Sequence, residues 1–508
     1  MTAPPLPPGT PPAAAPQGRR VAGMIWLSVL PLVVNAFSTL ASFIIIPGLG
    51  EIGWGIWSTA LGLSGATSFI AWLGIRPLFI RALARSVDHA ERNRLIGTQV
   101  AIRVLLAVVA GAVSLAVGVL VGYDQVTLTC AAIAALGLVP TVIWTVYSDV
   151  LNAQEEFRAS ALASLLSGLL LTLATVAVVL LGFGPIGVAL AYLVGPTLTM
   201  MQLGVLLRRR GLRLGPSFQV AELRHVAREA RVTATGDGLS ALLTRLSGIY
   251  IPAIVGTTQY GYFATGTLLG SRLQVVSDAV STAYNPELSR EAVSLRAGRS
   301  TWASRTLLRL LLLSGTLIGV VTMAVSGWFV ALLYRGDAAA GAREAATLVM
   351  AVTSGYLPLA VIAAGWRQLL VAVDHHDRAA KAAALASLIG ALVAVALTWQ
   401  LGVLGAAMGL VGSGAVSAAL LGTAARRVAG AAAGIPGWLR ALGAWLAGLA
   451  LALLAVREGA TRPGLLLGGA APLVTLGGFV VSGLLTREEL LLLAAKLAPR
   501  RGRGAPAP

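Results

Sequence analysis

The sequence predicts an all-α polytopic membrane protein with about fourteen spanning helices, and three observations lead to this prediction. First, 57% of the residues are hydrophobic and only 11% are charged, whereas a soluble chain of this length needs a far more polar surface. Second, apolar stretches of the roughly 20 residues that cross a hydrocarbon core recur along almost the whole chain. Third, the connecting loops alternate in length and in basic charge.

The apolar stretches fall into two groups of six helices, followed by a final pair. The first group is expected near 22–46, 52–75, 95–121, 126–151, 160–181 and 185–207. The second group is expected near 232–255, 260–283, 305–333, 345–373, 379–399 and 402–424. The last two helices are expected near 438–456 and 463–485.

More polar segments flank and separate these groups. The chain begins with a Pro- and Ala-rich segment without apolar periodicity, which predicts a disordered tail. A basic linker between the two groups is amphipathic, and we expect it to lie on anionic headgroups. The expected organisation is a tail at 1–20, an N-terminal bundle at 21–207, the linker at 208–231, a C-terminal bundle at 232–425, helices 13 and 14 within 438–485, and a basic tail at 486–508.

The net charge of +18 is concentrated in the loops on one side of the expected membrane topology. One set of loops and both termini carry most of the arginines, including Arg208, Arg209 and Arg210, while the opposite loops are short and carry few. Arginine and lysine are retained on the cytoplasmic side during insertion, so both termini are expected in the cytoplasm and the protein in the cell membrane. No soluble domain remains to present a basic face, and we therefore expect no nucleic-acid partner.

A faint internal repeat relates the two groups of helices. Three short matches occur in the same order, about 205–225 residues apart. Parallel repeats of this kind are typical of transporters, with the substrate path between the halves. The matching segments are 53–57 with 260–263, 161–165 with 384–388, and 184–189 with 402–407.

Four segments resemble landmarks of one family: 50–57 (GEIGWGIW), 72–85 (WLGIRPLFIRALAR), 151–158 (LNAQEEFR) and 402–407 (GVLGAA). Over roughly residues 21–425 the sequence is similar to the polysaccharide-export branch of the multidrug/oligosaccharidyl-lipid/polysaccharide (MOP) flippases. The resemblance implies two pseudo-symmetric six-helix bundles around a V-shaped cavity that opens alternately to each side. It also implies that the protein flips a polyprenyl-diphosphate-linked oligosaccharide to the outer leaflet, with membrane lipids and glycan polymerases or glycosyltransferases as partners.

Two arginines lie at mid-membrane depth in the predicted helices 7 and 8, namely Arg245 and Arg272. A charge at that depth costs roughly 2.5–3.5 kcal/mol on insertion scales, so neither side chain is expected to face lipid. One interpretation is a cationic site for a diphosphate, because the planar guanidinium matches phosphate oxygens. The other is a structural ion pair with Asp237 or Asp278.

Helix 7 also carries a polar stripe, since Asp237, Ser240, Thr244 and Ser247 follow helical spacing. We expect this stripe to line the substrate cavity beside Arg245. Serine and threonine hydroxyls can instead bond the backbone of their own helix.

Three further residues are candidate substrate contacts. Asn35, near Pro31 in helix 1, marks either a bend at the cavity or a packing kink. Arg76, at the exit of helix 2, is a candidate for the cytoplasmic gate. Arg367, beside Trp366 late in helix 10, is either an entry contact or an interface anchor.

Other polar residues are interpreted without a chemical role. Arg103, one to two turns into helix 3, is expected to snorkel to the interface. His375 and His376 sit in a short loop without a second ligand cluster, so no metal site is expected. No Gly-rich nucleotide loop is present, and no cofactor is expected.

Four alternatives to the oligosaccharide flippase remain. A drug/cation antiporter of the same superfamily predicts carboxylates in helices 1–3, which contain none. A membrane-embedded glycan polymerase or ligase predicts a long external loop, and the longest expected one has about ten residues. A lipid-linked peptidoglycan precursor flippase shares the superfamily fold, and a non-transporting scaffold of a glycan-assembly complex has a similar pattern. We therefore expect a transporter and no enzyme.

Overall fold

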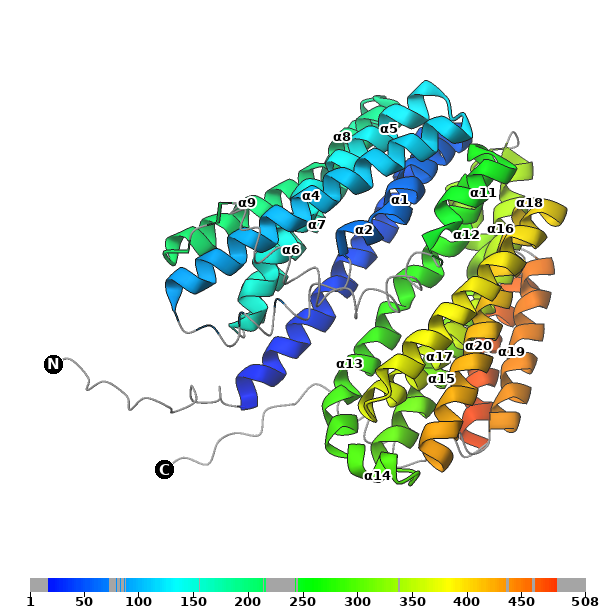
Figure 1. Cartoon of the computed structure of the whole chain (residues 1–508). Helices are drawn as coiled ribbons and strands as arrows, with labels where there is room; N and C mark the ends of the chain where they lie inside the picture. Colours follow the sequence, from blue (N-terminus) through cyan, green and yellow to red (C-terminus); the bar gives the residue numbers. More distant parts are fainter. Residues whose placement is uncertain are drawn as a thin grey trace, which may run out of the picture. The chain divides into compact units, whose positions relative to one another are not determined.

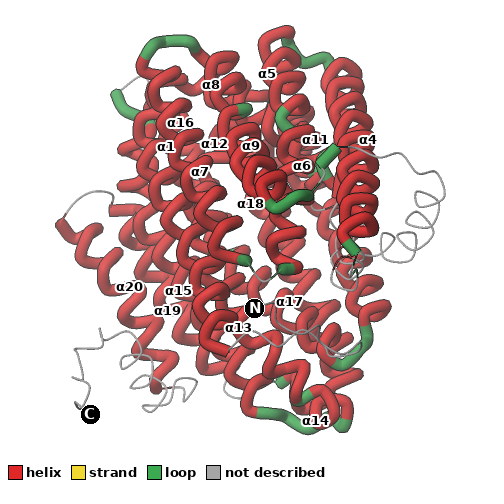
Figure 2. The backbone as a smooth tube through the Cα atoms, turned by 90° about the vertical axis from the view of Figure 1, so that its left-hand side faces the viewer, coloured by secondary structure: helices red, strands yellow, loops and turns green. Residues whose placement is uncertain are grey.

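The computed structural model describes most of the chain between Gln17 and Val481, and its described part is helical without strands (Figure 2). The described residues are 17–72, 79, 83, 86, 88–154, 156–212, 214–215, 243, 245–336, 339–434, 438–458 and 462–481. The expected all-α fold is thereby confirmed. The C-terminal tail and most of the linker lie outside the described residues, as does the N-terminal tail before Gln17.

The chain divides into two compact units. Unit 1 comprises Met1–Gly48 and Leu63–Ala234, and unit 2 comprises Leu49–Gly62 and Thr235–Pro508. One short stretch of the first helix therefore belongs with the second unit, although the sequence before and after it belongs with the first.

Most of the described helices follow one another with short connections (Figure 1). The segments between α2 and α4 and between α9 and α11 lie largely outside the described residues. Up to the linker they are α1 (Gln17–Thr67), α2 (Phe69–Trp72), α4 (His89–Val121), α5 (Gln125–Leu136), α6 (Leu138–Ala153), α7 (Phe157–Leu180), α8 (Gly184–Tyr192) and α9 (Val194–Arg209). After the linker they are α11 (Ser247–Val255), α12 (Thr257–Leu273), α13 (Val275–Arg290), α14 (Ala292–Arg296), α15 (Trp302–Leu333), α16 (Ala340–Ser354), α17 (Tyr356–Ala372), α18 (His376–Ala429), the 3₁₀ turn η2 (Gly430–Ala433), α19 (Trp438–Glu458) and α20 (Arg462–Val481).

Two of these helices each contain a pair of the predicted spans. α1 covers predicted helix 1 and most of predicted helix 2, and α18 covers predicted helices 11 and 12. The division within each falls at a glycine with positive φ, which is 68° at Gly50 and 62° at Gly402. Side chains with a Cβ rarely adopt such φ values, so glycine permits the turn between the spans at each position. Both glycines lie in the segments that resemble family landmarks.

Four other spans consist of two consecutive helices, interrupted at Gly137, Leu193, Gln274 and Gly355. In three of them a proline follows the interruption by three positions. Proline has no N–H to donate, and its ring clashes with the carbonyl four residues earlier, which locally breaks the helix. These prolines are Pro140, Pro196 and Pro358.

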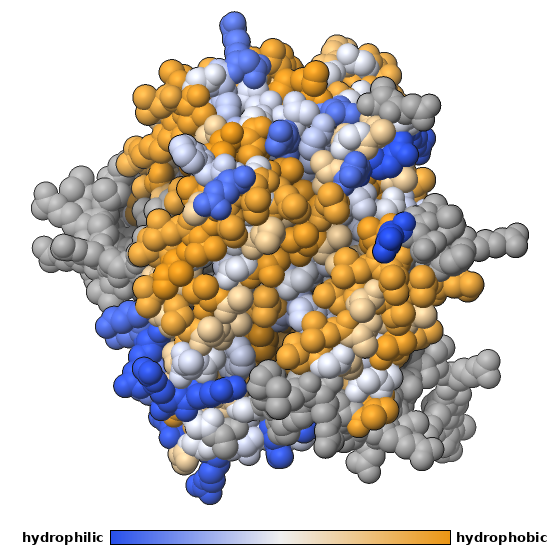
Figure 3. Space-filling model, turned by 90° about the vertical axis from the view of Figure 1, so that its right-hand side faces the viewer, coloured by the Kyte–Doolittle hydropathy of each residue, from blue (hydrophilic) through white to orange (hydrophobic). Residues whose placement is uncertain are grey.

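Each unit has its own apolar core. In unit 1 the buried residues include Ile96 of α4, Val146 of α6 and Leu203 of α9. In unit 2 they include Leu307 of α15 and Leu369 of α17. Large hydrophobic side chains are also exposed on many helices, and Figure 3 shows broad hydrophobic areas on one face of the molecule. Eight helical stretches of the described chain are long and apolar enough to cross a membrane, which agrees with a multi-pass membrane protein.

Candidate functional site

The structure describes four of the eight predicted site residues. Arg272 lies half-buried in the last turn of α12, Arg367 lies half-buried in α17, and Arg245 is exposed just before α11. Asn35 lies half-buried in α1, where its carbonyl accepts a hydrogen bond from Thr39 Oγ1 at 2.8 Å. The other four lie outside the described residues, and with them most of the polar stripe of helix 7. They are Asp237, Ser240, Thr244 and Arg76.

Close to Arg272 in the chain, unit 2 contains a small cavity of about 60 Å³ to which several polar side chains contribute. Ser271 and Gln274 line it from the junction of α12 and α13, and Thr353 and Ser354 line it from α16. The Ser271 and Ser354 hydroxyls donate to the carbonyls of Leu268 and Ala351. Their oxygens remain available as acceptors, so the cavity suits a few water molecules.

Unit 2 also contains an apolar pocket of about 220 Å³ between five helices. Trp366 of α17 forms part of its wall, and its position is fixed because its indole Nε1 donates to the Ala433 carbonyl at 3.1 Å. Arg426 is the charged residue among those that line the pocket. The lining comprises Leu312, Thr316, Pro358, Leu359, Ile362, Trp366, Ala418, Arg426, Leu442, Trp445 and Phe479.

Sequence reasoning did not single out Arg426. It lies exposed in the last turn of α18, followed by Arg427. A cation at a helix C-terminus interacts favourably with the partial negative charge of the last carbonyls. The sequence signal was therefore two consecutive arginines at the end of a predicted span. That signal indicates membrane topology equally well, and only the packing of α17 against α18 brings Arg426 to the same pocket as Trp366.

A buried ion pair joins two helices of unit 1. Arg103 of α4 and Asp149 of α6 lie 3.6 Å apart (Nη2 to Oδ2), with side-chain exposures of 1% and 0%. The expectation that Arg103 snorkels to the interface is therefore wrong. A carboxylate on the neighbouring helix offers the guanidinium a partner inside the protein, and such pairing is the usual condition for ionisable residues within spans.

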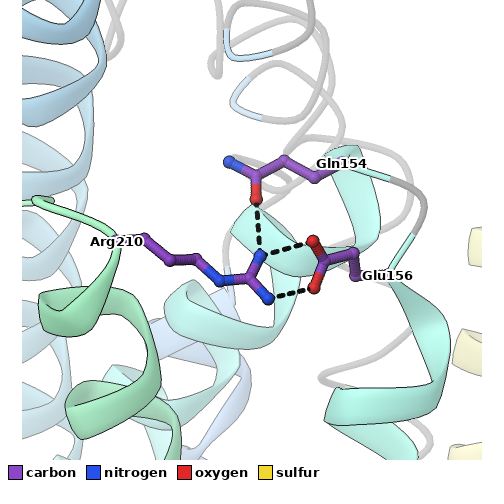
Figure 4. A network of polar contacts seen from close by, with 3 residues as sticks. All are labelled: Gln154, Glu156 and Arg210. Carbon is purple, nitrogen blue, oxygen red and sulfur yellow. Dashed lines mark hydrogen bonds and ion pairs between the residues drawn. The ribbon is translucent and has the colours of Figure 1, made fainter.

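The segment after α6, which resembles a family landmark, forms a polar network with the end of α9 (Figure 4). The Arg210 guanidinium donates to both carboxylate oxygens of Glu156 and, at 3.4 Å, to Gln154 Oε1. This hydrogen bond with Glu156 raises the pKa of Arg210. The bidentate geometry fixes the α6–α7 connection against the C-terminal end of α9.

In unit 2, the Leu49–Gly62 stretch of α1 packs closely on α11 and α12. The Trp54 indole Nε1 donates to Thr265 Oγ1 at 2.9 Å and to the Gly261 carbonyl at 3.1 Å. Thr265 Oγ1 in turn lies 3.0 Å from the Tyr334 hydroxyl. These bonds tie the segment that begins at Gly50 to the second unit.

Glycines allow this close approach. A Cβ added at Gly248 would lie 2.3 Å from the Gly62 carbonyl oxygen, and one added at Gly55 would lie 2.5 Å from the Thr257 carbonyl oxygen. Small residues are typical of membrane helix interfaces, because dispersion contacts between closely spaced backbones drive association there.

Solved structures with a similar fold are membrane transporters. Lipid II flippase MurJ, in an inward closed conformation, has a TM-score of 0.67 at 12% identity, and the match covers 89% of this chain and 99% of that one. An inward-facing multidrug resistance MATE family transporter of the MOP superfamily has a TM-score of 0.62 at 15% identity, covering 80% and 98%. A MOP superfamily transporter from Pyrococcus furiosus has a TM-score of 0.54 at 15% identity, covering 81% and 96%.

At these identities the structural likeness shows the fold alone, and no curated protein sequence matches the chain. A sequence-family model described as "Polysaccharide biosynthesis protein" matches residues 49–334, which is more than half of the chain. The match includes the 50–57 and 151–158 segments on which the resemblance rested. The structural likeness shows that the chain has the fold of the MOP superfamily of membrane transporters. The family-model match, together with the all-helical multi-pass architecture, shows that the chain belongs to the polysaccharide biosynthesis protein family.

Proposed function

We propose that this protein flips a polyprenyl-diphosphate-linked oligosaccharide from the cytoplasmic to the outer leaflet of the cell membrane. The observation that carries the proposal is the apolar pocket of unit 2 with Arg426 among its lining residues. Such a cargo has an apolar tail and an anionic diphosphate. The pocket offers an apolar surface to the tail and a guanidinium to the diphosphate.

The chemistry of the cargo explains why a protein is needed. A glycan cannot cross hydrocarbon unaided, because each unsatisfied polar group there costs several kcal/mol. The lipid tail can remain in an apolar environment throughout. A pocket between α15, α17, α18, α19 and α20 gives part of the tail such an environment inside unit 2, and the rest can stay in the bilayer.

The charge of the cargo supports an arginine contact. A diphosphate accepts paired hydrogen bonds from a guanidinium, whereas an ammonium acts as a point charge. Arg426 lines the pocket, and Arg367 follows the pocket residue Trp366 in α17. We assign the first diphosphate contact to Arg426, and we keep Arg367 and Arg272 as further contacts along the path.

A second candidate cargo is a lipid-linked peptidoglycan precursor. The observation that favours it is the likeness to the structure described as a lipid II flippase, which covers 89% of this chain. The family model, described by polysaccharide biosynthesis, favours the oligosaccharide instead. A direct comparison of the two cargoes therefore belongs in the same experiment.

The proposal is tested with the full chain in proteoliposomes that contain a fluorescent polyprenyl-diphosphate oligosaccharide. Ala418→Phe fills the pocket, and Ala419→Phe is its matched control, because Ala419 is exposed on the same helix and Ala418 lines the pocket. Arg426→Gln removes the positive charge, whereas Arg426→Lys keeps the charge and removes the planar guanidinium. Arg427→Gln is the control. Arg272→Ala and Arg272→Lys test the mid-membrane arginine in the same way.

We expect Ala418→Phe and Arg426→Gln to lower the flipping rate at least tenfold at unchanged expression, while both control variants stay near wild type. Arg426→Lys should retain part of the rate. Equal flipping rates in Ala418→Phe and Ala419→Phe would show that the pocket does not take part in flipping. If the wild-type protein flips only the peptidoglycan precursor, that precursor is the cargo instead of the oligosaccharide. If it flips neither lipid, the result would support a scaffold role.

A further inference from the structure

Unit 1 contains a cavity of about 570 Å³ that the proposed function does not use. Three helices line it together with Leu214 and Gly215 after α9, mostly with apolar side chains. The volume falls within the roughly 300–1,000 Å³ of typical ligand pockets. The lining includes Val100 and Val104 of α4, Val139 and Ile143 of α6, and Met201 and Val205 of α9.

The cavity opens at the outer surface of α9. Met201 and Val205 line it, yet these two side chains are 56% and 52% exposed. Both lie on a helical stretch that is long and apolar enough to cross a membrane. In a membrane, an open apolar crevice on such a helix is filled by lipid chains or by apolar protein.

One end of the cavity carries a positive charge. Arg208 lines it, and Met201, Val205 and Arg208 follow i, i+4, i+7 spacing on one face of α9. The rise from Met201 to Arg208 is about 10 Å. Arg208 is exposed in the last turn of a candidate span that ends at Arg209, the level at which headgroups begin.

We propose that this cavity binds an anionic phospholipid, with one acyl chain between α4, α6 and α9 and the phosphate on Arg208. An apolar crevice that ends in a guanidinium at the membrane interface complements this ligand in shape and charge. A zwitterionic lipid carries a cation beside its phosphate and gains less from Arg208. An extended peptide would place backbone groups in hydrocarbon, where they lack partners.

The proposal is independent of the proposed cargo, because it concerns unit 1 and its test measures lipid binding instead of flipping. The full chain, purified in detergent, is titrated with phosphatidylglycerol or phosphatidylcholine, and bound lipid is counted by native mass spectrometry. The variants are Arg208→Gln, Arg208→Lys and Val205→Trp. Arg209→Gln is the matched control, because Arg209 is exposed in the same turn and does not line the cavity.

Wild-type protein should bind phosphatidylglycerol more tightly than phosphatidylcholine. Arg208→Gln should weaken phosphatidylglycerol binding about fivefold, which corresponds to about 1 kcal/mol per basic residue near a membrane surface. Arg208→Lys should restore most of that affinity. Val205→Trp should weaken binding of both lipids by filling the crevice, and Arg209→Gln should have no effect.

Three results would overturn the proposal. Equal affinity in Arg208→Gln and Arg209→Gln would show that the charge at the cavity is not used. Displacement of bound phosphatidylglycerol by a polyprenyl diphosphate would assign the cavity to the cargo. Unchanged binding in Val205→Trp would show that lipid does not enter the crevice.

Discussion

Two helix contacts, one in each unit, are held by different means. In unit 1, α4 and α6 are linked by the buried pair of Arg103 and Asp149. In unit 2, the Leu49–Gly62 stretch packs on α11 and α12 through close glycine contacts and the hydrogen bonds of Trp54. An ion pair depends on the presence of both partners, whereas a glycine contact depends on the absence of a side chain. The two contacts should therefore respond to opposite kinds of substitution.

The largest effect is expected from Asp149→Asn. This change leaves the Arg103 cation buried without its carboxylate, which should lower the free energy of unfolding by about 3–5 kcal/mol. Denaturation of the purified protein in mixed micelles measures the difference. The double variant Arg103→Met with Asp149→Leu should regain most of the loss, because well-packed apolar residues often replace a buried pair at little cost. A loss below 1 kcal/mol in the single variant would mean that the pair is not desolvated as the structure indicates.

A smaller effect is expected from Gly248→Ala in unit 2. The new methyl would lie 2.3 Å from the Gly62 carbonyl oxygen, so the two backbones must move apart, at a cost of roughly 1–3 kcal/mol. The same denaturation measurement applies. Gly65→Ala is the control, because no atom lies within 4 Å of a Cβ added there. Alanine is the better helix former, and this control should be neutral or slightly stabilising. Equal losses in both variants would contradict a close contact at Gly248.

The smallest effect is expected from Glu156→Gln, which sharpens the comparison within unit 1. The pair of Glu156 and Arg210 is bidentate, but its side chains are 39% and 33% exposed. Water and salt screen such a pair, so its loss should cost less than about 1 kcal/mol. The cost should shrink further when denaturation is repeated at high ionic strength. An effect as large as that of Asp149→Asn would show that burial does not distinguish the two pairs.

The candidate site was predictable only in part. Arg272 and Arg367 were singled out because a charge inside a long apolar stretch is visible in the sequence. Both lie half-buried in the helices of unit 2, and their contact with substrate stays a prediction. Arg426, which we propose as the first diphosphate contact, was not singled out because an arginine at the end of a span reads as a topology signal. Arg103 was placed at the interface because its partner lies 46 positions further along the chain. No local pattern joins the two residues.

The sequence by itself determined that the chain is an all-helical, multi-pass membrane protein of the polysaccharide biosynthesis family. Apolar length and the turns at Gly50 and Gly402 are local properties, which a stretch of about 20 residues already expresses. The tertiary structure alone decided that Asp149 meets Arg103, that Leu49–Gly62 belongs with unit 2, and that Trp366 and Arg426 share one pocket. Each of these depends on which helix faces pack together. Many faces of this chain are similarly apolar, and their pairing is settled by close packing and by the few polar groups that need partners.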